Sequence, residues 1–371
     1  MTTTGDVEPL FSSRDSEITW SPAWRMPAEW EPHARTWMAW PSAPYTLGET
    51  RSDAEEAWDA WARVANAIVE FEPTTVLVDP AMGEQARRRL SSAIERVEVR
   101  LDDAWYRDSG PTFVVGEDEL GAVNWVFNGW GKQEWATWEH DATVSGVATG
   151  LSGATRIESA MVNEGGGLHT DGRGTFLVTE TVQLDPNRNP GWTKGHVEAE
   201  LRRTVGARKV IWVPRGLTRD SERYGTRGHI DIVATFASPG RVLIHDQRDD
   251  NHPDYAVSAE VASLLSAETD ADGRPLEIIR LPAPKVLIDE GGWVDYSYVN
   301  HFVANGAVIA CSFADPIDGE AREILAEAYT GRTVVAVDAR ALFARGGGIH
   351  CITQQQPIVG QVVAPDQEVK A

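Results

Sequence analysis

The sequence has little cysteine, a shortage of basic residues and no long apolar run. Two cysteines among 371 residues cannot build a disulfide framework. No uninterrupted apolar stretch reaches the ~18 residues that a membrane-spanning helix needs. Residues 1–20 lack a basic start followed by an apolar run, so a secretory signal is not expected. These absences predict a soluble, cytoplasmic protein with no membrane partner.

The shortage of basic residues narrows the class of ligand. The 34 Lys and Arg residues stand against 56 Asp and Glu residues, which gives a formal net charge of −22. Nucleic-acid binding needs basic patches, so nucleic acid is excluded as a partner. An acidic protein attracts small cations over long distances, although the same balance also serves solubility alone. Hydrophobic residues make up 42%, which is enough for a full core.

Strand and helix patterns recur in units of two strands, a helix and a further strand. The first helix is expected after Ser52, whose spacing to Glu55 fits a capping box. Further helices are expected at about 83–94, 194–205, 254–268 and 318–329, followed by strands at 97–101, 209–213, 276–281 and 333–338. A repeat of more than about 50 residues favours a ring or array of units. We therefore predict one α/β domain over residues 1–371, with 1–22 and 365–371 as flexible ends.

Polar residues recur where the first strands of these units are expected to begin. The stretch WYRDSGP contains Asp108, NEGGGLHTDG contains Glu164, RGHIDIV contains His229 and Asp231, and GGGIHCIT contains Cys351. Their spacings are 164 − 108 = 56, 229 − 164 = 65 and 351 − 229 = 122, the last being about two units. Equivalent points of a pseudo-symmetric ring meet near its axis, so these residues should converge. On a strand, His229 and Asp231 would point the same way.

These residue types suit the chemistry of a guanidinium group. Two neighbouring carboxylates repel each other unless a cation lies between them, and a planar guanidinium offers several N–H donors to both. A thiolate is a nucleophile whose pKa falls near positive charge, and a histidine can protonate a leaving amine. The glycines at 346–348 would let the backbone turn and a substrate approach closely, placing Cys351 at the rim of a cleft. An ordinary glycine-rich turn with an inert thiol is the alternative.

Motifs along most of the chain resemble the agmatine deiminase family, which belongs to the guanidine-modifying (pentein) enzymes together with peptidyl-arginine deiminases. They run from MPAEWEPHARTWMAWP (26–41) to GGGIHCITQQQP (346–357), through RDSGPTFVV, NWVFNGWG, LDPNRNP, GHID and SYVN. The resemblance implies a five-bladed α/β-propeller of ββαβ units with pseudo-fivefold symmetry. It also implies hydrolysis of agmatine to N-carbamoylputrescine and ammonia through a covalent thiouronium intermediate, without metal or cofactor, in a homodimer or larger homo-oligomer.

The resemblance also implies a role for each of the converging residues. Cys351 resembles the nucleophile, and His229 resembles the general acid and base. Asp108 and Asp231 resemble the carboxylates that bind the guanidinium nitrogens. Glu164 resembles the family glutamate that keeps the histidine protonated.

The resemblance also concerns the binding of the substrate, through two further residues and through two segments that differ from the family pattern. Trp105 resembles a residue that lines the substrate channel, and Gly347 resembles a substrate-binding position beside the nucleophile. The sequence departs from the family pattern at 42–49 and 284–296, where the far end of the substrate is expected. Guanidine hydrolysis is therefore expected, with another small guanidino compound, or amidino transfer, as alternatives to agmatine hydrolysis.

Other polar clusters are interpreted as structural. The stretch DQRDDNHPDY (246–255) resembles a metal site, but acids just before a helix are typical of a capping loop. His169 and Asp171 are expected in a hairpin turn. His350 is expected to pack or to form hydrogen bonds.

Overall fold

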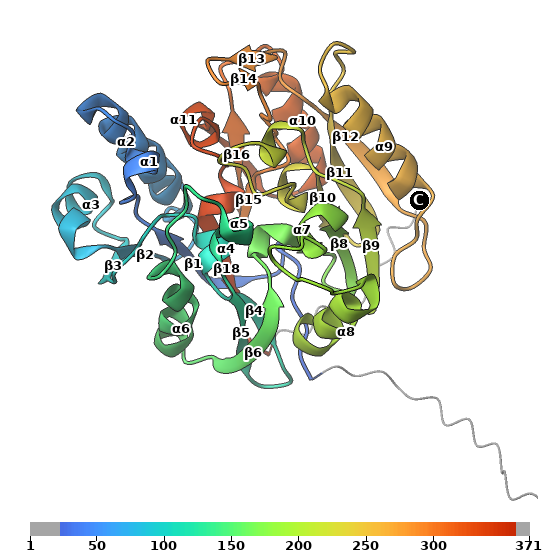
Figure 1. Cartoon of the computed structure of the whole chain (residues 1–371), viewed down its shortest axis with the longest axis horizontal. Helices are drawn as coiled ribbons and strands as arrows, with labels where there is room; N and C mark the ends of the chain where they lie inside the picture. Colours follow the sequence, from blue (N-terminus) through green and yellow to red (C-terminus); the bar gives the residue numbers. More distant parts are fainter. Residues whose placement is uncertain (1–22, 361–371) are drawn as a thin grey trace, which may run out of the picture.

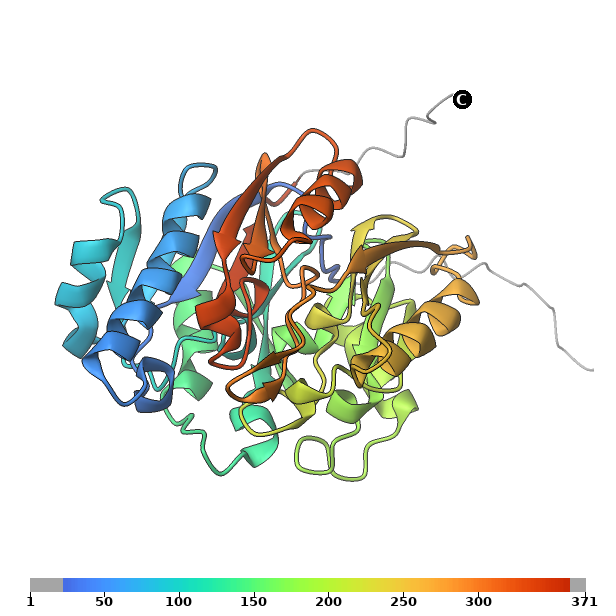
Figure 2. The ribbon, with the colours of Figure 1, turned by 90° about the horizontal axis from the view of Figure 1, so that it is seen from above.

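The computed structural model describes residues 23–360, so the predictions on 1–22 and 365–371 lie outside the described residues. It is a mixed α/β structure built from several small sheets. The first sheet joins the two ends of the described chain (Figure 2), because β1 (His33–Ala39) pairs antiparallel with β18 (Thr353–Pro357). On its other side β1 pairs parallel with β2 (Thr74–Val78), which is followed by β3 (Glu95–Glu98).

Within residues 23–360, four further sheets repeat one three-stranded order. In each of them the first two strands are antiparallel and the last two are parallel. The sheets are β4 (Thr112–Val115), β5 (Leu120–Val126) and β6 (Thr155–Val162); β7 (Leu168–Thr170), β8 (Thr175–Thr179) and β9 (Lys209–Val213); β10 (Ala234–Ser238), β11 (Arg241–Asp246) and β12 (Glu277–Pro282); and β15 (Phe302–Ala304), β16 (Ala307–Ser312) and β17 (Thr333–Asp338). A separate ribbon consists of β13 (Ile288–Asp289) and β14 (Gly292–Trp293).

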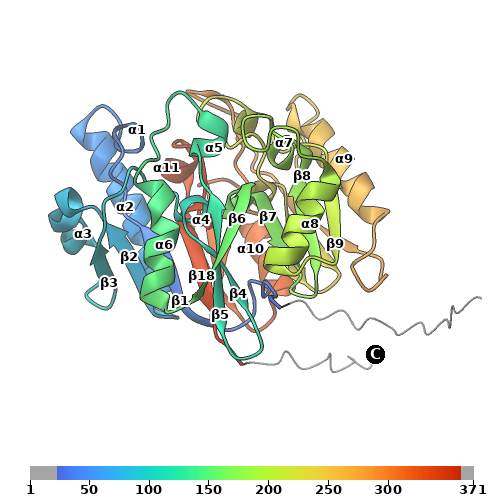
Figure 3. The same cartoon turned by 60° about the horizontal axis from the view of Figure 1, so that its bottom comes forward.

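A helix connects each parallel pair of strands, as a parallel crossover requires. These helices are α2 (Arg51–Ile68), α6 (Asp141–Ser152), α8 (Lys194–Val205), α9 (Asp254–Ser266) and α10 (Asp318–Ala328). Figures 1 and 3 show α2, α6, α8 and α9 on the outside of the molecule, whereas the short α4 (Tyr106–Ser109) lies near its middle, close to β18. The predicted order of two strands, a helix and a strand is thus present in the four three-stranded sheets. The first sheet follows it only with β18 as its first strand, and it adds β3, which α3 (Gly83–Arg89) joins to β2.

Several predicted boundaries are wrong. The capping box of α2 is formed by Thr50 and Asp53, two residues before the predicted pair. Helix α3 (Gly83–Arg89) is shorter than expected, and β3 begins two residues before the predicted strand. Helix α6 was not predicted, because its N-terminus is capped from a distant segment. The side chain of Asp102, 38 residues earlier, accepts the backbone N–H of His140 at 2.6 Å.

The buried faces of the helices and sheets form the core. Helix α2 buries Trp58, Trp61, Val64 and Ile68, the stripe that its helical spacing produces. Burying one such large apolar side chain contributes about 1.5–3 kcal/mol, so this stripe is enough to dock the helix on its sheet. Among residues 23–360, no helix is both long and apolar enough to cross a bilayer.

Candidate active site

The predicted site residues lie on short helical turns that precede the first strands of four sheets. Asp108 lies on α4 before β4, and Glu164 precedes the turn η2 (Gly165–Gly167) before β7. His229 precedes η4 (Ile230–Ile232), which contains Asp231, before β10. Cys351 lies on η5 (His350–Ile352) before β18. The structure brings these five side chains together in one buried cluster.

The prediction of a strand through His229 and Asp231 is wrong, since β10 begins only at Ala234. The cause is the buried carboxylate of Asp220. It accepts the backbone N–H groups of Gly228 and His229 at 2.8 and 2.9 Å, which holds this backbone in a turn instead of in a hydrogen-bonded strand. Both side chains still reach the cluster.

His229 lies between two carboxylates. Its Nε2 lies 3.2 Å from Oε2 of Glu164, and its Nδ1 lies 3.8 Å from Oδ1 of Asp108. Burial opposes a charge on the ring, but Asp108, Glu164 and Asp231 together raise the pKa of His229 to about 9. The ring is therefore an imidazolium at neutral pH. Because Glu164 occupies Nε2, the nitrogen that faces the rest of the site is Nδ1.

Glu164 is itself fixed as an anion by Arg188. The guanidinium Nε of Arg188 lies 3.0 and 3.1 Å from the two carboxylate oxygens, and both side chains are fully buried. Burial raises the pKa of Glu164, but Arg188 and His229 outweigh it and lower the pKa below its usual range. A second carboxylate, Asp185, accepts from Nη1 of Arg188 at 2.9 Å and completes the support.

Asp108 has donors on both oxygens. Trp130 donates from Nε1 to Oδ2 at 2.9 Å, and the backbone N–H of Gly166 donates to Oδ1 at 3.2 Å. Burial raises the pKa of Asp108 to about 6, with Asp231 and Glu164 adding to the rise and His229 opposing it. Asp108 is therefore ionised at neutral pH and becomes protonated in mild acid.

Cys351 lies against Asp231 and Asn300. Its Sγ is 3.5 Å from Oδ2 of Asp231, and Nδ2 of Asn300 donates to it at 3.3 Å. Burial raises the pKa of the thiol well above its usual value, and the carboxylates of Asp231 and Asp108 raise it further. At neutral pH the sulfur is therefore a thiol, which a bound cation would help to ionise.

The glycines before Cys351 are required by space as well as by conformation. Gly346 has a φ of +110°, which side-chain-bearing residues rarely adopt. A Cβ on Gly347 would lie 2.7 Å from the ring of Trp105 and 3.1 Å from Sγ of Cys351. A Cβ on Gly348 would lie 2.4 Å from the side chain of Asn300. The glycines thus let Trp105 and Asn300 pack closely against this segment, and the predicted approach of a substrate stays a prediction.

The expectation that Cys351 lies at the rim of a cleft is wrong, because the residue is only 4% exposed. Aromatic side chains cover it. Trp105 donates from Nε1 to the hydroxyl of Tyr45 at 2.5 Å, and Tyr45 stacks on Tyr224 at 5.9 Å. Trp135 packs against both tyrosines.

Outside the aromatic cover lies a cavity of about 720 Å³, to which Tyr224 contributes one wall. Charged side chains of both signs line the rest, including Arg219 and Asp289, which form an ion pair at 2.7 Å. One of the two departures from the family pattern lines this cavity, since 284–296 contains Asp289. The other, 42–49, contains Tyr45, which stacks on Tyr224 of the cavity wall.

Sequence reasoning missed several residues of the site, of which Asn300 had the clearest signal. Its spacings are 300 − 229 = 71 and 351 − 300 = 51, so it fills the one unit left empty in the predicted series. It also ends the motif SYVN. Gly166, Trp130 and Arg188 lie in quoted motifs as well, but their contacts depend on segments far apart in the chain.

Asp171 lies in the hairpin turn between β7 and β8, as predicted. It accepts the backbone N–H groups of Arg173 in the turn and of Thr175 at the start of β8. His169 lies on β7 itself and not in the turn. His350 is buried and hydrogen-bonded, as expected.

Fold and site together are those of a guanidine-modifying hydrolase, and comparison with known proteins gives the family. Residues 25–357 match the model of the Porphyromonas-type peptidyl-arginine deiminase family, and the chain belongs to this family. A Streptomyces avermitilis protein that carries the provisional name of agmatine deiminase is 54% identical over 336 residues, which cover 90% of this chain and 97% of that protein.

Two further relatives carry the same name. An agmatine deiminase of Medicago truncatula is 38% identical over 366 residues, covering 90% of this chain and 96% of the relative. The solved structure of the agmatine deiminase of Enterococcus faecalis superposes with a TM-score of 0.86 at 32% identity, covering 90% of this chain and 96% of that one. The resemblance to agmatine deiminases drawn from the motifs is confirmed.

Proposed function

We propose that the protein hydrolyses agmatine to N-carbamoylputrescine and ammonia, with Cys351 as the nucleophile. One observation carries the proposal beyond the family names. Nδ1 of His229 and Oδ1 of Asp231 are two of several buried polar atoms of the described residues that lack a hydrogen-bond partner, and both belong to this one cluster. Buried polar groups usually have partners, and a guanidinium beside these two would supply donors to Asp231.

The first half of the reaction removes ammonia. Asp108 and Asp231 bind the guanidinium nitrogens, and the charge of the substrate offsets the two carboxylates that keep Cys351 protonated. The thiol then loses its proton to water, and Sγ attacks the guanidinium carbon to form a neutral tetrahedral adduct. The Nδ1–H of His229 protonates one NH2 group, the C–N bond breaks, and ammonia leaves. A thiouronium cation on Cys351 and a neutral His229 remain.

The second half returns the enzyme to its starting state. Neutral His229 takes a proton from water, and the resulting hydroxide attacks the thiouronium carbon. The C–S bond of Cys351 breaks, and the protonated ureido product gives its excess proton back to the sulfur. The neutral product then leaves, and Cys351 is a thiol again. Glu164 keeps His229 charged before each turnover, because its carboxylate faces Nε2.

The proposal extends to the architecture and setting of the enzyme. Five sheets of one topology, and a first sheet that joins both ends of the described chain, support a single catalytic domain built as a five-bladed α/β-propeller with pseudo-fivefold symmetry. The family resemblance supports a cytoplasmic enzyme without metal or cofactor, assembled as a homodimer or larger homo-oligomer.

Ammonia release from a panel of guanidines tests the function. The panel contains agmatine, arginine, methylguanidine, guanidinobutyrate and a peptidyl-arginine, with EDTA present and Cys351→Ser as the inactive reference. Agmatine should be the best substrate and the variant should be dead. Preference for another guanidine would reject agmatine but keep the chemistry, and loss of the amidino group to added ornithine instead of water would reject hydrolysis.

A further inference from the structure

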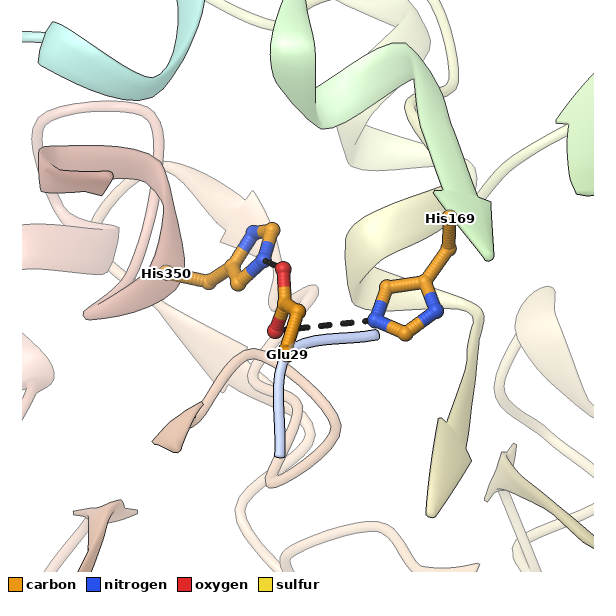
Figure 4. A group of neighbouring side chains, drawn as sticks. All are labelled: Glu29, His169 and His350. Carbon is orange, nitrogen blue, oxygen red and sulfur yellow. Dashed lines mark hydrogen bonds and ion pairs between the residues drawn. The ribbon is translucent and has the colours of Figure 1, made fainter. Parts of the chain in front are cut away.

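A second group of buried ionisable side chains lies directly behind Asp231. Figure 4 shows Glu29, His169 and His350, which come from the segment before β1, from β7 and from η5. Within residues 23–360 this is the one set of acidic, His or Cys side chains whose spacing would suit a metal ion. All three are less than 5% exposed.

Their contacts fit a hydrogen-bonded network better than a metal site. Nε2 of His350 lies 2.7 Å from Oε1 of Glu29, the distance of a charge-assisted hydrogen bond. The buried guanidinium of Arg107 lies 3.3 Å from the same oxygen, so a second cation there would be repelled. His169 accepts the backbone N–H of Phe236 on Nδ1 and lies 2.6 Å from the hydroxyl of Thr235 through Nε2.

The two nitrogens of His350 face two different carboxylates. Nδ1 lies 2.8 Å from Oδ2 of Asp231, on the side opposite to Glu29. Carboxylates accept hydrogen bonds, so both ring nitrogens must carry a hydrogen and the ring is an imidazolium. The same Oδ2 of Asp231 lies 3.5 Å from Sγ of Cys351. The chain of contacts therefore runs from Glu29 through His350 and Asp231 to the thiol.

We infer that Glu29 and His350 are positioning residues that hold Asp231 ionised and oriented toward the guanidinium and the thiol. The inference rests on the proposed function for its kinetic readout. Neither residue touches the substrate or the reacting atoms; each acts through Asp231. Glu29 lies in the motif MPAEWEP and His350 directly before Cys351, so both ends of the chain meet behind the site.

The charges around His350 support this role. Burial and Arg107 oppose its protonation, but Glu29 and Asp231 together raise the pKa of His350. Burial likewise works against ionised Asp231, and His350 overcomes it and lowers the pKa of Asp231. The remaining ionisable neighbours are His169, with its ring 6.3 Å away, and His301. Burial lowers the pKa of His301 to about 4, so it contributes no charge at neutral pH.

The kinetic test replaces the imidazolium by a neutral donor of similar reach, in His350→Gln. Without the cation the pKa of Asp231 rises, so the fall of kcat/KM in acid should reflect protonation of both Asp231 and Asp108. The pH at which kcat/KM falls should rise by about one unit, and the fall should depend on two protons instead of one. The loss of kcat/KM should therefore be about tenfold greater at pH 6 than at pH 8. The matched control is His252→Gln, a buried histidine bonded to the backbone at Val294 and Asp254.

A spectroscopic test is independent of turnover. The wild-type protein is labelled on its histidine nitrogens, and the signal of His350 is identified by its loss in His350→Gln. The ring of His350 should remain an imidazolium at pH values well above the usual pKa of histidine. Glu29→Gln should move its titration to lower pH by at least about one unit. A neutral His350 ring at pH 7, or an unchanged titration in Glu29→Gln, would overturn the inference even if the variants are inactive.

Failure of the proposed function can be distinguished from failure of the positioning role. If the wild-type protein releases no ammonia from any guanidine while His350 titrates as expected, the proposed function fails and the network stands. If the wild-type enzyme is active but His350→Gln loses the same factor of kcat/KM at every pH, as a merely destabilised variant would, the positioning role fails.

Discussion

Gly166 should be intolerant of even one methyl group, and Gly166→Ala tests the geometry of the site. A Cβ there would lie 2.6 Å from Nδ1 of His229 and 3.0 Å from both Oδ1 of Asp108 and Oδ2 of Asp231. Nδ1 of His229 is the atom to which we assign proton transfer, and the two oxygens belong to the carboxylates to which we assign guanidinium binding. Each is buried and held from behind by other side chains, so none can move away without losing a hydrogen bond.

The magnitude follows from the displacement. Contacts of 2.6 to 3.0 Å must open by several tenths of an ångström at three points, and overpacking of a buried site costs about 1–3 kcal/mol in stability. Misplacing reacting groups by about 1 Å costs about 100-fold in rate, or about 2.7 kcal/mol in the barrier. We therefore expect kcat/KM for agmatine to fall at least ~100-fold in Gly166→Ala, with folding retained.

The assay compares steady-state ammonia release and thermal unfolding of Gly166→Ala with those of Gly150→Ala. Gly150 is an exposed position in α6 where a Cβ would meet nothing within 4 Å. Its substitution should leave kcat/KM unchanged and raise helix stability by about 0.5–1 kcal/mol. Near-normal turnover in Gly166→Ala would refute the assignment of these three atoms.

Three further outcomes follow from the charges of the site. A plot of kcat/KM against pH should be bell-shaped. It should fall below about pH 6 as Asp108 gains a proton and above about pH 9 as His229 loses one. A profile that is flat between pH 5 and 7 would contradict the assignment of Asp108. Trp130→Phe removes a donor to Asp108 and should move the acidic limb upward by up to about one pH unit, whereas an unchanged limb would show that this hydrogen bond does not tune the carboxylate. Because Asp231 and Asp108 raise the pKa of the Cys351 thiol, neutral iodoacetamide should inactivate the enzyme slowly at pH 7 and faster as pH rises, while a cationic haloamidine should be fast at pH 7; equal rates at pH 7 would count against substrate-assisted ionisation.

The repeat pattern and the polar positions could be predicted from local sequence, because each depends on residues close together in the chain. Strand periodicity located β9 and β17 to the residue. The unit spacing alone grouped Asp108, Glu164, His229 and Cys351, which the structure brings together.

The parts that could not be predicted depend on contacts between distant segments. Helix α6 begins where the side chain of Asp102 caps it, which no local pattern reveals. Asp220 turns the backbone at His229 out of the expected strand through hydrogen bonds that a strand pattern hides. The aromatic group beside Cys351 includes Tyr45, which is bonded to Trp105 and lies about 300 residues away in the sequence. Local sequence gives the chemistry of such residues, and only the fold gives their partners.

The most direct test of the central claim is to trap the intermediate on Cys351. Wild-type enzyme turning over agmatine is quenched in acid, digested and analysed by mass spectrometry. We expect the peptide that contains Cys351 to gain the mass of agmatine minus ammonia, and the gain to be absent in Cys351→Ser. Continued ammonia release by Cys351→Ser at the wild-type rate, or steady turnover by the wild-type enzyme with the mass gain on another residue, would contradict covalent catalysis by this thiol.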